Sequence, residues 1–333
     1  MQQKLHYLVL LVAAIFAFSF SASAKVWRVN NTAGVSADFA QISAAISNSQ
    51  VQPGDTIYVE GTATTYGYTI LSKRLVLIGT GYLLSGATGN AGLQFNTNSS
   101  KFSTLDVDSL ASGSTFVGLE GNIRLSAGVD NITITRCNVI IDRISGGLKS
   151  EHLVFNKCLL SLNMSSALAD DVQVTNCYIN NWFHIPGGNN VLVRNNVINV
   201  SSPNISNGYF ANNIFISSGN VNGVVNSSFK YNISVYNMLP TGNNNQNSVP
   251  YANIFVGSGS ADGQYQLKAG SPAIGAGEPV NGVTPDCGMF GTADPYRLSG
   301  IPPVPTIYEL TVPATVPSSA TSMTATVSTR SNN

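Results

Sequence analysis

The stretch that decides the fold is VQVTNCYIN, residues 172–180. It begins with the two-residue alternation of a β-strand, because Val172 and Val174 flank the polar Gln173. An Asn-Cys pair then interrupts the pattern, and strand-like residues resume at once. A strand that stops and restarts within two residues predicts a sharp corner between two strands.

The same phrase recurs along the chain, each time with apolar residues shortly before a Cys or an Asn. Four clear copies and two weaker ones end at these anchors: Cys137, Cys158, Cys177, Asn196, Asn213 and Asn232. The spacings between successive anchors are 21, 19, 19, 17 and 19 residues. A unit of about twenty residues with two or three short strands has no room for a helix and is typical of a β-solenoid.

Stacking explains why one phrase is repeated. A single coil cannot bury its apolar face alone, so it lies on the next coil about 4.8 Å away, and equivalent side chains form columns. We expect the anchor residue to turn the chain, since Asn tolerates the left-handed backbone conformation and can bond its neighbour's backbone. Three consecutive anchors, Cys137, Cys158 and Cys177, are expected to be buried free thiols that act as small apolar fillers.

The repeated phrases ITITRCNVI, VQVTNCYI and VLVRNNVI resemble those of the right-handed parallel β-helix proteins of the pectate-lyase-like superfamily. FAQISAAISNSQVQPGDTIYVEG is similar to the cap and first coil of that family, and YQLKAGSPAIGAG to its last coil. The C-terminal segment is similar to the endings of exported β-helix proteins of the Bacteroidetes type. The resemblance spans roughly residues 36–277 and implies an all-β fold, a right-handed parallel β-helix. It leaves the activity open, because the superfamily holds lyases, hydrolases, epimerases and proteins without known chemistry.

Four segments follow from these patterns. Residues 1–24 read as a signal peptide, with a basic start, the apolar run YLVLLVAAIFAFSF and a small-residue cleavage site that ends at Ala24. Residues 25–55 are predicted to form an N-terminal strand and capping helix, 56–277 the β-helix, and 278–333 a Pro-rich extension with β-strands. We expect Asp38 to cap the helix.

Composition narrows the function. The chain has 16 basic and 16 acidic side chains, and charged residues are 10% of the total. This gives no general attraction to nucleic acid or to anionic lipid. We expect a protein that is secreted, or placed at the cell surface or in the periplasm, with no membrane span in the mature chain. Its polarity comes from side-chain amides and hydroxyls, which can hydrogen-bond a polysaccharide or a cell-surface component, so we expect such a partner. The oligomeric state stays open.

Candidate site residues come from the segments that follow each corner. In a lyase or hydrolase, Arg143 or His184 would serve as the base or would neutralise a uronate. Trp182 would stack on a sugar ring, and Asn163 and Asp142 would bind substrate. The alternative is that these are scattered outward side chains. Arg136 and Lys157, just before their anchors, are expected to be solvated surface residues.

Calcium is the one metal that the resemblance raises, and it applies only if the protein is a lyase. Asp170 and Asp171 would then be the cation ligands. The other interpretation is that the two carboxylates begin a turn. No other cofactor is expected, because the sequence has no Cys or His spacing typical of a zinc site.

Three functional hypotheses remain. The first is an exported scaffold that binds extended carbohydrate or a surface partner without catalysis. The second is a polysaccharide lyase or glycoside hydrolase that acts through the face around residues 142–184. The third is a purely structural or adhesive module.

Overall fold

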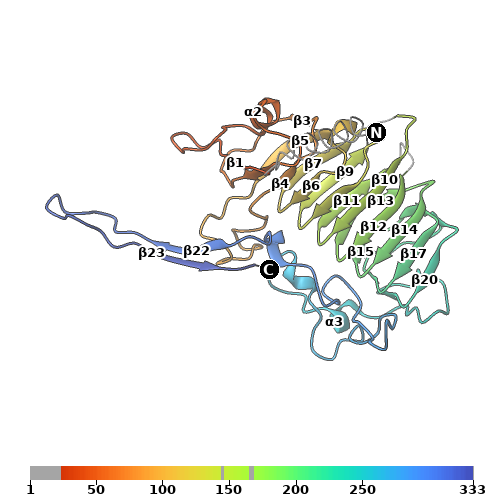
Figure 1. Ribbon diagram of the computed structural model, residues 1–333. Coiled ribbons are helices and arrows are strands. Elements are labelled where there is room, and N and C mark those ends of the chain that lie inside the picture. The colour runs from red at the N-terminus through yellow and green to blue at the C-terminus, as the bar shows by residue number, and fades with distance from the viewer. Residues whose placement is uncertain (1–23, 144–145, 165–168, 333) are drawn as a thin grey trace, which may run out of the picture.

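The computed structural model describes residues 24–143, 146–164 and 169–332, and nearly all of the predicted signal peptide lies outside these residues. The fold is an all-β parallel solenoid, as predicted (Figure 1). Two long parallel sheets run side by side along its axis, and each coil contributes a strand to both. Equivalent strands of successive coils therefore pair with one another.

The first sheet holds ten strands: β1 (Val26–Val29), β2 (Thr56–Val59), β4 (Val76–Ile78), β6 (Thr115–Val117), β8 (Ile132–Thr135), β10 (Ser150–Asn156), β12 (Ala169–Thr175), β14 (Asn189–Arg194), β17 (Gly208–Ala211) and β20 (Ser228–Lys230). The second sheet holds eleven: β3 (Thr69–Leu71), β5 (Lys101–Val107), β7 (Glu120–Leu125), β9 (Asn138–Arg143), β11 (Leu159–Asn163), β13 (Tyr178–Ile185), β15 (Val197–Asn199), β16 (Asn204–Ser206), β18 (Ile214–Phe215), β19 (Val224–Val225) and β21 (Ile233–Ser234).

The strand register stacks equivalent residues of successive coils on one another. Val172 of β12 pairs with Leu153 of the coil before and with Val191 of the coil after, and all three side chains are buried. Because side chains alternate along a strand, this register sends one apolar column into the space between the sheets. Full burial of an aliphatic side chain contributes about 1.5–3 kcal/mol. Each coil is therefore stabilised mainly by its two neighbours.

The corner lies one residue earlier than predicted. The left-handed residues are those just before the anchors, with φ between 53° and 59°: Arg136, Lys157, Asn176, Asn195, Asn212 and Tyr231. The turn tolerates Arg, Lys and Tyr as well as Asn. The anchor side chains instead point inward, where they are buried.

The buried anchors form one hydrogen-bonded column. The Cys137 N–H donates to the sulfur of Cys158 at 3.5 Å, and the Cys158 N–H to the sulfur of Cys177 at 3.3 Å. The Cys177 N–H donates to Asn196 Oδ1 at 2.9 Å, and the Asn196 N–H to Asn213 Oδ1 at 3.0 Å. Each anchor side chain thus accepts the backbone N–H of the previous anchor. The three stacked cysteines are buried free thiols, as expected.

The N-terminal end of the solenoid is covered by helix α2 (Ile42–Ser47), which buries Ile42 and Ile46. Asp38 does not cap this helix, and Gln41 holds the N-cap position without a side-chain hydrogen bond. Asp38 accepts instead from the backbone N–H of Arg28 at 2.7 Å. The carboxylate therefore fixes the loop against β1.

Residues 251–301, here called the strap, cover the corner of the solenoid. They contain α3 (Tyr251–Ile254), η2 (Gly263–Tyr265) and η3 (Leu298–Gly300). Asn176 Nδ2 donates to the Met289 carbonyl at 3.1 Å, and Asn195 Nδ2 donates to the Asp286 carbonyl at 3.1 Å. The stretch YQLKAGSPAIGAG belongs to this strap, so it is not a stacked coil.

The strap also corrects the prediction for two cations. Arg136 is only 7% exposed and Lys157 only 4% exposed, so neither is a solvated surface residue. Arg136 donates to the Ile301 carbonyl at 2.7 Å, and Lys157 pairs with Asp294. Because these corner residues project from the solenoid, the strap supplies their partners.

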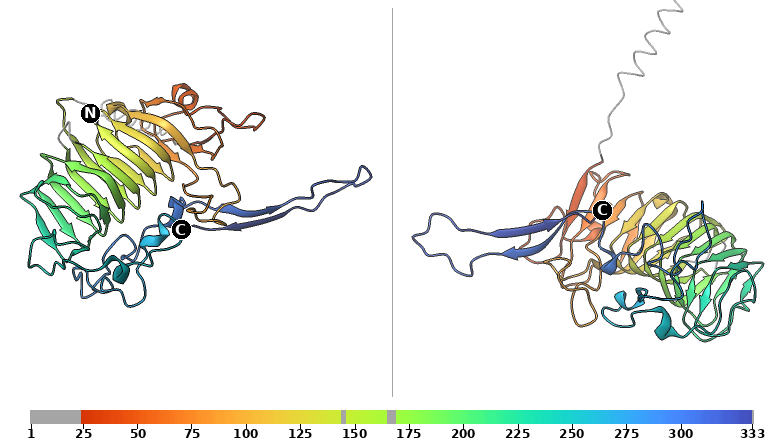
Figure 2. Two further views of the ribbon diagram at one scale, coloured as in Figure 1. Left: turned by 180° about the vertical axis from the view of Figure 1, so that it is seen from behind. Right: turned by 90° about the horizontal axis from the view of Figure 1, so that it is seen from below.

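The C-terminal extension forms the antiparallel pair β22 (Thr306–Thr311) and β23 (Thr326–Arg330). This hairpin projects away from the solenoid (Figures 1 and 2). A short 3-10 helix, η1 (Ser109–Ala111), completes the described elements. In the described part of the chain no helix has the length and apolar character needed to cross a membrane.

The buried column makes a direct prediction for stability. Asn196→Ala removes the acceptor of the Cys177 N–H and the donor to the Val174 and Arg194 carbonyls. Because these groups would be left buried without partners, we expect a loss of about 3 kcal/mol in the free energy of unfolding. Denaturant unfolding followed by circular dichroism measures this. Asn199→Ala, at an exposed position of β15, is the matched control and is expected to change stability by less than about 0.5 kcal/mol. Equal effects of the two substitutions would contradict the role of the column.

Candidate functional site

Three of the predicted site residues stack on the outer face of the second sheet. Asp142 of β9 pairs in register with Asn163 of β11, which pairs with His184 of β13. Trp182 lies beside them, is 51% exposed and meets the His184 ring edge to face, with 5.1 Å between ring centroids. We call this surface the β9–β13 face. It brings one aromatic ring and three polar side chains onto consecutive coils.

The polar row continues toward the N-terminal end of the sheet. Arg124 of β7 pairs in register with Asp142 and with Asp106 of β5. Its guanidinium donates twice to the Asp106 carboxylate, at 2.6 Å each, and the Tyr68 hydroxyl donates to the same carboxylate at 2.7 Å. Burial would raise the pKa of Asp106, but these hydrogen bonds outweigh it and lower the pKa. This end of the row is a fixed ion pair.

Arg143 does not share this face. It follows Asp142 on β9, pairs with the buried Leu125 of β7 and is itself only 6% exposed. Its guanidinium donates to the Leu148 carbonyl, and burial lowers its pKa. The alternation of the strand therefore turns Arg143 and His184 to opposite sides of the sheet.

Asp170 and Asp171 lie elsewhere, at the start of β12 in the first sheet. Asp170 accepts from Lys149 Nζ at 2.6 Å and from the Asn189 N–H at 3.0 Å. Burial would raise its pKa, but the hydrogen bonds from Lys149 and Asn189 lower it. Asp171 accepts from Asn190 Nδ2 at 2.5 Å. In the described residues, no three His, Cys, Asp or Glu side chains are grouped as a metal site would require, and calcium stays a prediction that rests on the resemblance.

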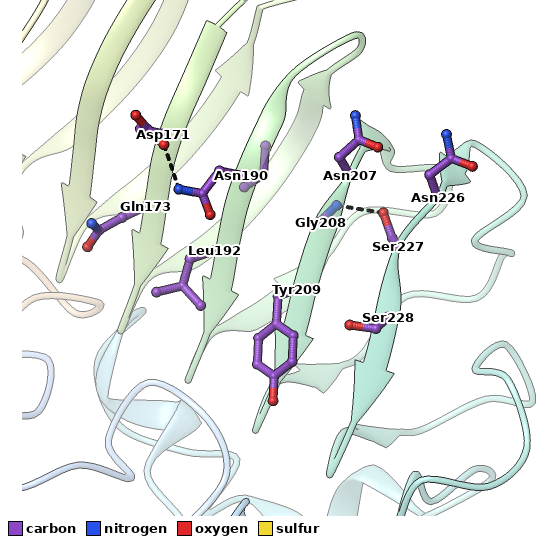
Figure 3. Close-up of a pocket in the computed structure, with 11 residues that line it drawn as sticks. Asp171, Gln173, Asn190, Leu192, Asn207, Gly208, Tyr209, Asn226, Ser227 and Ser228 are labelled. Carbon is purple, nitrogen blue, oxygen red and sulfur yellow. Dashed lines mark hydrogen bonds between the residues drawn. The ribbon is translucent and has the colours of Figure 1, made fainter.

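A hollow lies on the outer face of the first sheet, across β12, β14, β17 and β20. It has a volume of about 600 Å³. Figure 3 shows two rows of side chains along it. The row at the strand starts holds Asp171, Asn190, Asn207 and Asn226, and the next row holds Gln173, Leu192, Tyr209 and Ser228. We call this hollow the amide groove.

A second left-handed corner creates the amide row. Asp171, Asn190, Asn207 and Asn226 all have φ between 50° and 54°, which Asn and Asp tolerate better than most residues. Their spacings of 19, 17 and 19 residues repeat those of the anchors Cys177 to Asn232. The sequence pattern built on the anchors does not include this second series, although its period can be read in the sequence.

One rim of the groove is charged. The Tyr209 hydroxyl donates to Glu278 Oε1 at 2.5 Å, and Arg194 lies 3.4 Å from the same carboxylate. The Lys230 ammonium lies 5.6 Å from the centre of the Tyr209 ring. Burial, and then the bond to Glu278, raise the pKa of Tyr209 to about 12. The ring is therefore held in place and uncharged at neutral pH.

No protein-family model matches the chain, and a search of curated proteins finds no match. The geometry of these surfaces is therefore the basis for any functional argument.

The contacts of Asp170 lead to a prediction that separates a structural carboxylate from a calcium ligand. Its pKa is lowered in the folded state, so its contribution is present above the unfolded pKa of about 3.9 and is lost as the pH falls through the folded value. We expect Asp170→Asn to cost about 1 kcal/mol at pH 7, and the two proteins to converge at an acid pH below the lowered folded-state pKa of Asp170. Urea unfolding at both pH values, with calcium and with EDTA, measures this. A calcium-dependent rise in the unfolding midpoint of the unmodified protein, absent in the variant, would show ligation instead.

Proposed function

We propose that the protein is an exported, non-catalytic β-solenoid scaffold that binds an extended neutral carbohydrate in the amide groove. The observation that carries the proposal is the amide row itself, in which Asn190, Asn207 and Asn226 stand on consecutive coils beside Tyr209. Each amide has both donors and acceptors for sugar hydroxyls.

The spacing of the groove suits a chain of sugar rings. Consecutive rungs are about 4.8 Å apart, a distance close to the length of one sugar unit. An oligosaccharide that lies along the solenoid axis would present one unit to each amide. Leu192 and the Tyr209 ring supply the apolar part of the lining, on which a sugar ring can pack.

The charge of the groove favours a neutral ligand. Among its lining residues the one charged side chain is Asp171, whose carboxylate accepts from Asn190. At the rim, Glu278 contacts both Tyr209 and Arg194, and the Lys230 ammonium lies over the Tyr209 ring. A chain of neutral hexoses meets no unpaired charge in this lining.

The same chemistry argues against catalysis in the groove. A glycoside hydrolase needs two carboxyl groups on either side of the scissile bond, and a lyase needs a base beside a group that neutralises a uronate. The lining has one carboxylate, Asp171, with His152 Nε2 3.4 Å from it, and the rim carboxylate Glu278 is engaged by Tyr209 and Arg194. On the β9–β13 face, Arg143 is turned away from Asp142 and His184. These residue positions support a protein that binds carbohydrate without cleaving it.

The β9–β13 face is a second candidate surface for the same function. The exposed Trp182 stands beside Asn163, Asp142 and His184, and a sugar ring can stack on an exposed indole. The two surfaces belong to different sheets, so substitutions in one leave the other unchanged.

Glycan binding by single-residue variants tests the proposal. We expect Tyr209→Ala to weaken retention on a neutral polysaccharide affinity gel about tenfold, because the loss of a stacked ring corresponds to about 1.4 kcal/mol. Tyr209→Phe, which keeps the ring and loses the Glu278 bond, should bind nearly as well as the unmodified protein. Trp182→Ala reports on the β9–β13 face, and Tyr236→Ala, at an exposed tyrosine outside both surfaces, is the control.

Four outcomes would contradict the proposal. If Tyr209→Ala and the control bind equally well, the amide groove is not the binding site. If only Trp182→Ala loses binding, the binding site is the β9–β13 face. Release of reducing or unsaturated sugar ends by the purified protein would show an enzyme. No retention on any neutral or acidic glycan would leave a structural or adhesive module.

A further inference from the structure

The N-terminal end of the solenoid holds a carboxylate that neither surface uses. Asp55, just before β2, is only 4% exposed. Its oxygens accept from the Trp27 indole N–H at 2.8 Å, the Gln52 N–H at 2.9 Å and the backbone N–H of Lys25 at 2.9 Å. All three donors are uncharged in an uninterrupted chain. A buried carboxylate that meets only neutral donors keeps part of its desolvation cost.

The third donor sits at the predicted cleavage point. Ala24 and Lys25 are both exposed, so the peptide bond between them is open to a protease. The chain beyond it is fixed, because the Lys25 carbonyl accepts from the Thr56 N–H at 2.8 Å at the edge of the first sheet. The Lys25 side chain lies over the Trp27 ring, with its ammonium 3.4 Å from the ring centre. The backbone nitrogen of Lys25 is thus held directly against the Asp55 carboxylate.

We propose that the chain is cut between Ala24 and Lys25 and that Asp55 is the receptor for the new α-ammonium group of Lys25. The step is a hydrolysis by an endopeptidase that recognises small residues. Water adds to the Ala24 carbonyl carbon, the C–N bond breaks, and Ala24 leaves as a carboxylate. The Lys25 nitrogen takes up protons and becomes an ammonium group at neutral pH. The neutral N–H donor at 2.9 Å from Asp55 Oδ1 becomes a charged one without moving.

The change in charge strengthens this end of the fold. A hydrogen bond between two ionised groups is shorter and roughly twice as strong as a neutral one. It also adds a second positive charge near the carboxylate, because the Lys25 side chain already helps to lower the pKa of Asp55. Because Asp55 also bonds Trp27 of β1 and precedes β2, the new ion pair ties the first strand to the second. Processing and closure of the N-terminal edge are therefore coupled.

The pair has a defined pH range. Burial would raise the pKa of Asp55, but the donors from Lys25, Trp27 and Gln52 outweigh it and lower the pKa, so the carboxylate is ionised at neutral pH. An α-amino group has an ordinary pKa of about 7.7–8.0, and a neighbouring carboxylate raises it in the folded state. The stabilisation is then fully present below about pH 7.7 and is lost as the pH rises through the raised value.

Two forms of the mature protein test the proposal. One begins at Lys25, and the other carries a Gly-Ser extension that moves the charge away from Asp55. We expect the extended form to melt at least about 3 °C lower at pH 7, and the difference to disappear well above pH 9. Asp55→Asn should abolish the difference, whereas Lys25→Gln, which keeps the α-ammonium group, should retain it. Equal melting temperatures of the two forms at pH 7 would overturn the proposal.

Two further measurements do not depend on how well the Asp55 variant folds. The α-amino group of the form that begins at Lys25 should show a pKa above 8 when its rate of reductive methylation is followed against pH by mass spectrometry. An ordinary value would overturn the ion pair. The exported protein should begin at Lys25 by N-terminal sequencing, and any other first residue would overturn the cleavage site. Neither result depends on whether the protein binds carbohydrate.

Discussion

At each strap-side corner of the solenoid a backbone N–H turns into the space between the two sheets, where no water can reach it. Leaving such a group without a partner costs about 1–3 kcal/mol. The anchor column removes that cost, because each anchor side chain accepts the N–H of the coil before it, as Asn213 does for Asn196 and Cys177 does for Cys158. This is why an Asn or a Cys, each able to accept a hydrogen bond, interrupts every apolar phrase. The thiols fill the same role with longer contacts, and they also donate to carbonyls, as Cys177 does to that of Thr175 at 3.2 Å. Burial raises the pKa of Cys137 and Cys177, so these thiols stay protonated.

The same requirement shapes the outside of the molecule. If the anchor points inward, the residue before it must take the left-handed conformation and project outward. Those outward residues are covered by the strap, which meets Asn176 and Asn195 with backbone carbonyls and Lys157 with a carboxylate. No described segment covers the opposite corner in this way, and its left-handed Asn190 and Asn207 are exposed. One corner is thus buried under the strap, and the other leaves these Asn side chains exposed.

Most of the fold was accessible from the sequence, and the reason is its period. A repeat of about twenty residues fixes which residues stack on successive coils, the column of cysteines included, without any long-range information. The corner was placed one residue late, because Asn occurs at both Asn195 and Asn196 and the sequence does not say which one turns. The burial of Arg136 and Lys157 was missed because their partners, Ile301 and Asp294, lie more than a hundred residues away and outside the repeat.

The candidate site was less accessible. Asp142, Asn163 and His184 do share a face, because the repeat fixes their register. Arg143 lies on the other side, which depends on where β9 begins its alternation. The amide groove depends on the second corner. Its period is present in the sequence, but the folded chain is needed to show that Asn190, Asn207 and Asn226 line one hollow.

The central claim is that Cys137, Cys158 and Cys177 stand one above another in a buried column between two parallel sheets. Sulfur anomalous diffraction from crystals of the protein tests it without reference to any sequence pattern. The account predicts three sulfur peaks in a row along the solenoid axis, on consecutive coils whose backbones are about 4.8 Å apart. Peaks that lie two or more rungs apart, or on different faces of the molecule, would contradict it.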